Sequence, residues 1–193
     1  MSTPPAPSSF AIDVPETLLA RARAGERAAF EELCRRFERP VYTLALRLIG
    51  DRDQASDALQ ETMLKLIAKV GEFRGEGGSP FWGWLRQIAV NEALMQVRRG
   101  RRFALELALE DDGLGEDPAP PPPAAADAAE LQRALAALPP TTRSVLWLYH
   151  AEGYTHEEIG AAMQRTASFS KSQLARGTRR LRALLHVEDP IHA

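Results

Sequence analysis

The chain has 193 residues, of which 45% are hydrophobic and 26% charged, with a net charge of −2 and a single cysteine. One cysteine excludes an internal disulfide and a cysteine-rich zinc site. No apolar run approaches the ~18 residues of a membrane span, and the N-terminus lacks the basic and apolar segments of a signal peptide. We therefore expect a cytoplasmic protein that does not insert into a membrane.

The charge is unevenly distributed along the chain. Residues 1–102 carry 16 basic and 13 acidic side chains, residues 103–131 carry no basic and eight acidic ones, and residues 132–193 carry eight and five. Two mildly basic segments thus flank a strongly acidic one. Because local rather than net charge attracts a polyanion, the small total does not exclude nucleic-acid binding.

The acidic middle segment also contains the run Pro118-Ala119-Pro120-Pro121-Pro122-Pro123. This composition buries little apolar surface and favours an extended backbone. Neither flank shows the alternation of a strand. The sequence therefore predicts an all-α protein, in which two small helical domains at 13–102 and 127–187 are joined by a flexible, acidic, Pro-rich linker at 103–126. A disordered N-terminus at 1–12 and a tail at 188–193 complete the prediction.

Helix signals follow one another through the first domain. Asp13 and Glu16 have the spacing of a capping box that starts a helix, and Gly25 ends it. A second helix, continuing to Gly50, is predicted by apolar residues at the spacing of a buried stripe: Phe30, Leu33, Cys34 and Phe37. This spacing assigns Cys34 to the core. Asp51 or Asp53 can cap a third helix, which runs to about Val70.

The third predicted helix has two chemically different sides when its residues are spaced at about 100°. One side gathers Ala55, Leu59, Thr62, Met63, Leu66 and Val70. The opposite side carries Asp57, Gln60 and Glu61. From the spacing alone, this polar side is either a solvated face or a surface that binds a partner.

A fourth helix is predicted to begin at Ser79-Pro80 and to end in Arg98-Arg99-Gly100-Arg101-Arg102. A polar stripe of Gln87, Asn91 and Arg98 lies beside its apolar stripe. Its tryptophans and arginines suit stacking on bases and contact with phosphates. The alternative keeps Trp84 as a core anchor and the arginines as a solvated last turn. Glu92 lies close to the apolar stripe, where an apolar residue is expected.

The second domain contains a short helix opened by a capping box, Thr155 with Glu158, then a tight connection and a longer helix from about 167 to 185. The outward side of the longer helix carries hydroxyl and basic groups: Ser168, Lys171, Ser172, Arg179 and Arg182. This order predicts a helix-turn-helix, whose second helix enters the major groove of DNA. An ordinary helical hairpin with a solvated basic face is the alternative.

Sites of catalysis are not indicated by the sequence. The four histidines have no metal-ligand spacing with one another or with Cys34. No glycine-rich phosphate loop follows a strand, and no nucleophile turn accompanies a Ser, His and Asp set. We expect no enzyme, no cofactor and no metal site.

Four sequence pieces occur in a fixed order along the chain. They are Asp57-Ala58-Leu59-Gln60-Glu61-Thr62, Phe73-Arg74-Gly75, the segment from Phe81 to Asn91, and Leu138-Pro139-Pro140 followed by Gly153-Tyr154-Thr155-His156-Glu157-Glu158-Ile159. Together they resemble the bacterial RNA polymerase sigma factors of the extracytoplasmic-function type. The resemblance covers nearly the whole chain.

The resemblance implies a protein that binds core RNA polymerase and directs it to promoter DNA, with sigma region 2 at 13–102 and region 4 at 127–187. It implies that Asp57, Gln60 and Glu61 dock on the clamp helices of the β′ subunit, with further contact to the β subunit. Recognition and melting of the minus-ten element would use Trp82, Trp84, Gln87, Asn91, Arg98 and Arg99. Binding of the minus-thirty-five element would use Ser168, Lys171, Ser172, Arg176 and Arg179.

The turn of the predicted helix-turn-helix departs from the family pattern. Gln164 and Arg165 stand where a glycine and an apolar residue are common, and Phe169 replaces a small polar residue. The family also suggests an anti-sigma factor as a further partner. Two other functions remain compatible with the residues alone: a helix-turn-helix regulator that acts without the polymerase, and a helical adaptor that binds only protein.

Overall fold

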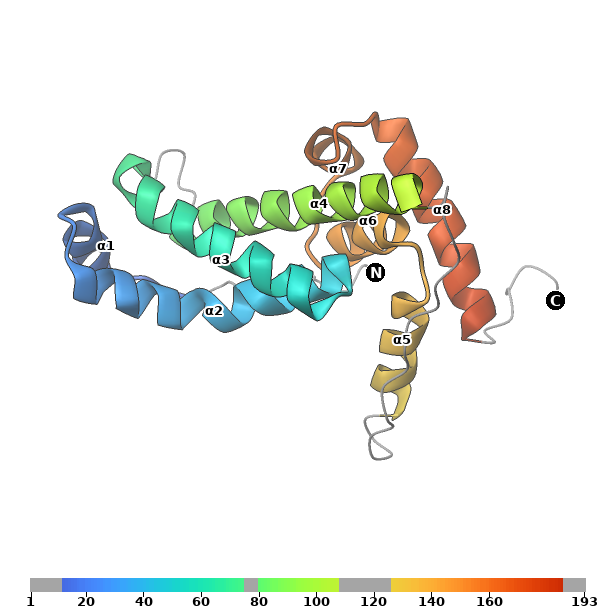
Figure 1. The fold of residues 1–193 in the computed structure, drawn as a ribbon, viewed down its shortest axis with the longest axis horizontal. Coiled ribbons are helices and arrows are strands. Elements are labelled where there is room, and N and C mark those ends of the chain that lie inside the picture. Colours follow the sequence, from blue (N-terminus) through green and yellow to red (C-terminus); the bar gives the residue numbers. More distant parts are fainter. Residues whose placement is uncertain (1–11, 75–79, 108–125, 186–193) are drawn as a thin grey trace, which may run out of the picture. The chain divides into compact units, whose positions relative to one another are not determined.

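A computed structural model describes residues 12–74, 80–107 and 126–185. These residues contain α-helices, one short 3-10 helix and no strand, which confirms the predicted all-α class (Figure 1). By its internal contacts the chain divides into two compact units, residues 1–96 and 97–193. The predicted N-terminal and C-terminal tails and most of the predicted linker lie outside the described residues. None of the described helices is long and apolar enough to cross a membrane.

The first unit is built on α1 (Glu16–Arg23), α2 (Arg27–Ile49), α3 (Arg52–Lys69), the 3-10 helix η1 (Val70–Glu72) and the first part of α4 (Phe81–Leu107). α2 packs along α3, and α1 contacts both α2 and η1. Its core consists of side chains that are almost fully buried: Leu33, Phe37, Leu48, Leu66, Leu85 and Leu94. Burial of these apolar groups is the main force that holds these helices together.

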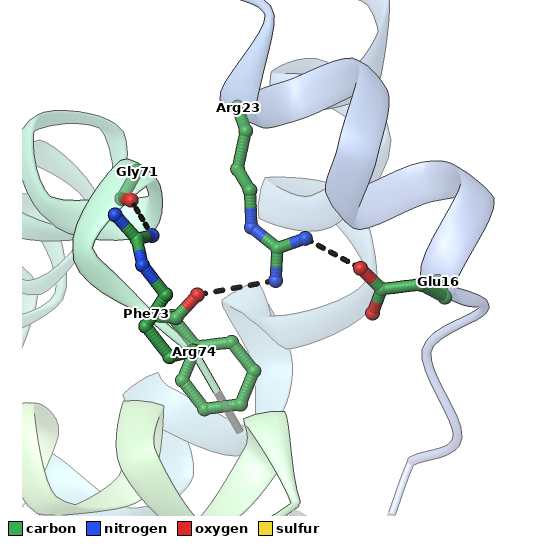
Figure 2. A network of polar contacts seen from close by, with 5 residues as sticks. All are labelled: Glu16, Arg23, Gly71, Phe73 and Arg74. Carbon is green, nitrogen blue, oxygen red and sulfur yellow. Dashed lines mark hydrogen bonds and ion pairs between the residues drawn. The ribbon is translucent and has the colours of Figure 1, made fainter. Parts of the chain in front are cut away.

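The start of α1 differs from the predicted capping box. Pro15 occupies the N-cap position, and no side chain caps the helix. Because α1 begins at Glu16, Asp13 lies outside it, and the Glu16 carboxylate instead forms an ion pair with Arg23. Arg23 also donates to the carbonyl oxygen of Phe73 at 3.1 Å, which ties α1 to the end of η1 (Figure 2).

Other predicted helix ends are confirmed. Gly50 ends α2 with φ +83°, a left-handed conformation that glycine adopts without a Cβ clash. The Asp51 side chain then caps α3 by accepting from the backbone N–H of Gln54 at 2.9 Å. Cys34 differs from the prediction, because it is half-buried at the edge of the core rather than inside it. Burial, with a smaller contribution from the Glu38 charge, raises the pKa of its thiol.

The fourth helix extends beyond the predicted end at Arg102. α4 continues to Leu107, five residues into the predicted linker, because the segment from Phe103 to Leu107 contains good helix formers and no glycine or proline. The next described helix, α5 (Ala126–Ala136), begins at the last residue of the predicted linker. Ser79, the predicted cap of α4, lies outside the described residues.

The second unit contains α5, α6 (Pro140–His150), α7 (His156–Ala162) and α8 (Ala167–Leu184). Leu135, Leu138 and Leu146 form its buried cluster, against which Trp147, Leu174 and Leu181 pack. The backbone of α8 approaches α6 closely at Gly177, where a Cβ would lie 2.6 Å from Cγ2 of Thr142. The capping box of α7 is confirmed, since Thr155 and Glu158 each bond the backbone N–H of the other.

Candidate functional site

The outward side of α3 presents polar and apolar groups in one stripe. Asp57, Gln60 and Glu61 are all exposed, as the helical spacing predicts, while Ala55, Ala58, Thr62 and Leu66 are buried on the inner side. Leu64 and Ile67 continue the exposed stripe at the same helical spacing, with exposed fractions of 61% and 45%. We call Asp57, Gln60, Glu61, Leu64 and Ile67 the α3 outer face.

Sequence reasoning missed the apolar half of this face. The signal was present, because Leu64 lies three residues after Glu61 and Ile67 three residues further. Large apolar side chains on a solvated face contribute less to stability than buried ones, because much of their surface stays in water. Their exposure beside carboxylate and amide groups is typical of a surface that binds another protein.

A partly buried ion pair joins α3 to α4 and accounts for Glu92. The Nζ atom of Lys65 lies 2.5 Å from Oε1 of Glu92. The Glu92 side chain is only 5% exposed, whereas that of Lys65 is 37% exposed. The carboxylate therefore sits beside the apolar stripe because a cation from the neighbouring helix compensates its charge. Pairing across 27 residues leaves no local sequence signal.

The start of α4 is held by a cluster of aromatic rings. The Trp84 ring centroid lies 5.5 Å from that of Phe73 and 5.4 Å from that of Phe81, and Phe81 in turn meets Phe37 edge-on. Trp84 is half-buried at the edge of this cluster. The core-anchor interpretation of Trp84 is thus supported, and any contact with DNA is limited to its exposed edge.

Gln87 and Asn91 form the polar part of α4 that faces solvent. Both are exposed, and Nε2 of Gln87 lies 3.4 Å from Oδ1 of Asn91. Trp84 shares their side of the helix, one turn earlier. Arg99 is exposed and Arg98 half-buried further along the same helix.

Trp82 does not belong to this side of α4. At about 100° per residue it lies about 160° around the helix from Trp84. The guanidinium of Arg86 is 5.5 Å from its ring centroid, and Trp82 is half-exposed. The structure therefore brings Trp84, Gln87 and Asn91 together and leaves Trp82 on a different side.

The helix-turn-helix is formed by α7, a turn and α8. Gln164 in the turn has φ +56°, and the Thr166 hydroxyl caps α8 by accepting from the N–H of Phe169 at 3.2 Å. The five predicted residues of α8 are all exposed: Ser168, Lys171, Ser172, Arg176 and Arg179. The inner side is fixed by Ser170, whose buried hydroxyl lies 3.0 Å from Nδ1 of His156.

The predicted set on α8 leaves out two residues at the turn. Arg165 is exposed, and its guanidinium lies 5.9 Å from the ring centroid of the half-buried Phe169. The departure of both residues from the family pattern was the available signal. Within the described residues, no group of three His, Cys, Asp or Glu side chains could hold a metal ion.

Comparison with known families and proteins gives a family match for each part of the chain. The Sigma-70 region 2 family matches residues 33–103, and the Sigma-70 region 4 family matches residues 128–181. The sigma factor CarQ of Myxococcus xanthus is 32% identical over 167 residues, which cover 86% of this chain and 95% of CarQ. The chain belongs to the ECF RNA polymerase sigma factors. As a sigma factor, it directs RNA polymerase in promoter recognition and is not itself a catalyst.

Other relatives agree with this placement of the ECF sigma factor. SigE of Mycolicibacterium smegmatis is 35% identical over 168 residues, which cover 83% of this chain and 64% of SigE. The solved structure of RpoE in complex with the anti-sigma factor NepR from Bartonella quintana is 28% identical, with a TM-score of 0.56. The match covers 83% of this chain and 98% of that RpoE chain. The alternatives of a regulator without polymerase and of a protein-only adaptor are therefore set aside.

Proposed function

We propose that this sigma factor binds core RNA polymerase through the α3 outer face, which docks on the clamp helices of the β′ subunit. The observation that carries this proposal is the single exposed stripe from Asp57 to Ile67. Acidic and amide groups occupy its first half and large apolar groups its second half. Such a face offers complementary charge to a basic partner and apolar area that becomes buried on docking.

Two neighbouring contacts hold the α3 outer face in place. The inner residues of α3 pack against α2, and the Lys65–Glu92 pair fixes α3 to α4. The backbone of this helix is already ordered before binding, so docking costs less conformational entropy than it would for a segment that folds on binding. Docking of α3 would therefore also position the Gln87 and Asn91 side of α4.

Promoter contacts are assigned to two further surfaces. We infer that α4 recognises and melts the minus-ten element through Trp84, Gln87 and Asn91, with Arg98 and Arg99 on phosphates and Trp82 at a separate contact. Exposed amides can bond base edges, and a half-exposed indole can stack on an unpaired base. The exposed stripe of α8 would enter the major groove of the minus-thirty-five element. Lys171 and Arg176 supply its positive charge.

The remaining assignments follow from the same reasoning. The region 2 unit would comprise 13–102 and the region 4 unit 127–187. The β subunit would provide a further contact, and the cytoplasm, where polymerase and promoters occur, would be the site of action. An anti-sigma factor is proposed as a further partner because the similar RpoE chain was solved with one. Purification of the chain from uninduced cells should yield such a protein bound in place of core polymerase.

The core-binding proposal is tested by reversing charge on the α3 outer face. The double variant Asp57→Arg, Glu61→Arg should lose binding to core polymerase by tenfold or more, measured by fluorescence anisotropy of the labelled chain. A matched control reverses two exposed acidic residues of α2, Glu31→Arg and Glu38→Arg. Equal loss in both double variants would reject the assignment, because it would show a response to net charge alone. The circular dichroism spectrum of each double variant must match that of the wild-type chain, which shows that both variants are folded.

A further inference from the structure

The turn of the helix-turn-helix carries an aromatic side chain that the proposed function does not use. Gln164, Arg165, Thr166 and Phe169 line an open hollow at the surface of the second unit. The Thr166 hydroxyl accepts from the backbone N–H of Phe169, so this residue is anchored in the first turn of α8. Its ring is half-exposed at the edge of the hollow.

Phe169 shares the side of α8 that carries the proposed base-reading residues. Ser172 lies three residues later and Arg176 seven residues later, which places all three on one helical stripe. Arg176 and Ser172 are exposed, and Nε of Arg176 lies 3.3 Å from the Ser172 carbonyl oxygen. The ring is therefore the single apolar group at the N-terminal end of an otherwise polar stripe.

The guanidinium of Arg165 lies beside that ring. It is 5.9 Å from the ring centroid and is exposed to solvent. A cation over an aromatic face is held in a restricted orientation. An exposed cation at the start of a recognition helix is suited to a phosphate of the DNA backbone.

The chemistry of the major groove selects a ligand for the ring. A phenyl ring neither donates nor accepts a conventional hydrogen bond, so it cannot distinguish the polar edges of bases. The thymine C5-methyl group is the apolar feature of the groove, and a phenylalanine can pack against it. We propose that Phe169 reads a pyrimidine C5-methyl group in the minus-thirty-five element, with Arg165 on the adjacent phosphate. This inference rests on the proposed entry of α8 into the major groove.

The test uses holoenzyme assembled from the full chain and core polymerase, on a promoter from which the wild-type protein initiates. Each thymine of the minus-thirty-five element is replaced in turn by deoxyuracil, which lacks only the methyl group. For the wild-type protein, one replacement should weaken holoenzyme binding about fourfold, as expected for one buried methyl-sized group. Phe169→Ala should bind the thymine promoter about fourfold more weakly and show no difference between thymine and uracil at that position.

Two further variants separate the roles of ring and cation. Arg165→Ala should keep the thymine preference while the slope of log affinity against log salt falls by about one phosphate contact. Leu184→Ala is the matched control, because Leu184 is an exposed apolar residue of α8, about 22 Å away along the helix. This variant should keep both the affinity and the thymine preference.

The outcomes separate this inference from the function on which it rests. If the wild-type holoenzyme initiates but binds every uracil promoter as tightly as the thymine promoter, the methyl contact is overturned. The same holds if Phe169→Ala keeps the wild-type preference. If the wild-type chain does not initiate with core polymerase on any promoter, the proposed function itself fails. An unchanged melting temperature of Phe169→Ala shows that its DNA effect does not arise from unfolding.

Discussion

The Lys65 ammonium and the Glu92 carboxylate meet at 2.5 Å and link α3 to α4 in the first unit. Because Glu92 is almost fully buried, removal of its cation leaves a charge without compensation. Lys65→Met should lower the free energy of unfolding of the first unit by about 2–3 kcal/mol. Urea unfolding in a Trp147→Phe background measures this, since Trp82 and Trp84 then report on the first unit alone.

The single variant Glu92→Leu and the double variant Lys65→Met, Glu92→Leu complete a double-mutant cycle, which measures the coupling between the two side chains. Replacing both partners by apolar groups of similar size removes the need for compensation, so most of the lost stability should return. Stability losses that simply add in the double variant would show that the pair is not coupled. The interpretation of Glu92 would then fail.

The apolar half of the α3 outer face predicts a salt-insensitive part of core binding. Leu64→Ser with Ile67→Ser should weaken binding to core polymerase at least tenfold, and the loss should persist at high salt. The loss in Asp57→Arg, Glu61→Arg should instead shrink as salt screens the charges. Leu131→Ser with Leu184→Ser removes two other exposed leucines, each 39% exposed, and should leave binding unchanged. Anisotropy titrations at two salt concentrations check both statements.

The two tryptophans of α4 should respond differently to truncation. Trp84 belongs to the aromatic cluster with Phe73 and Phe81, so Trp84→Ala should destabilise the first unit by about 2–4 kcal/mol. Trp82→Ala should cost less than about 1 kcal/mol, because Trp82 lies outside that cluster. Unfolding curves measure the stability, and potassium permanganate footprinting measures promoter opening. A stability loss as large in Trp82→Ala as in Trp84→Ala would contradict the assignment of the cluster.

Cys34 predicts a pH dependence of stability. Burial raises the pKa of its thiol, so the folded chain keeps the proton at pH values where the unfolded chain releases it. The stability that this group contributes is present below about pH 8.5 and is lost as the pH rises further. Cys34→Ala should flatten this part of the stability curve. Slower alkylation of Cys34 in the folded chain than in urea, at pH 8, provides an independent readout.

Local sequence patterns predicted the helices whose signals lie within a few residues. The Gly50 end, the Thr155–Glu158 box and a cap at Asp51 or Asp53 are such cases, and helical spacing placed Asp57, Gln60 and Glu61 outward. The capping-box pattern at Asp13 gave the wrong N-cap residue, because Pro15 occupies that position and the helix begins at Glu16. The end of α4 was placed too early because a run of arginines does not stop a helix.

Local sequence patterns could not predict features that depend on contacts between residues distant in the sequence. The partner of Glu92 lies on another helix, and the half-burial of Trp84 depends on Phe73, which precedes it by 11 residues in the sequence. Leu64 and Ile67 are different, since their helical spacing from Glu61 puts both on the outer side of α3, a signal that sequence reasoning did not use. Exposed apolar residues in an amphipathic helix are read as core until the packing of that helix is seen.

The most direct test of the account is transcription by reconstituted holoenzyme. The chain, mixed with bacterial core RNA polymerase, is supplied with a library of genomic promoter fragments, and run-off products are sequenced. We expect initiation at a defined subset of fragments that depends on both components and is lost in Asp57→Arg, Glu61→Arg. Failure of the folded chain to bind core polymerase, together with specific binding to duplex DNA on its own, would contradict it.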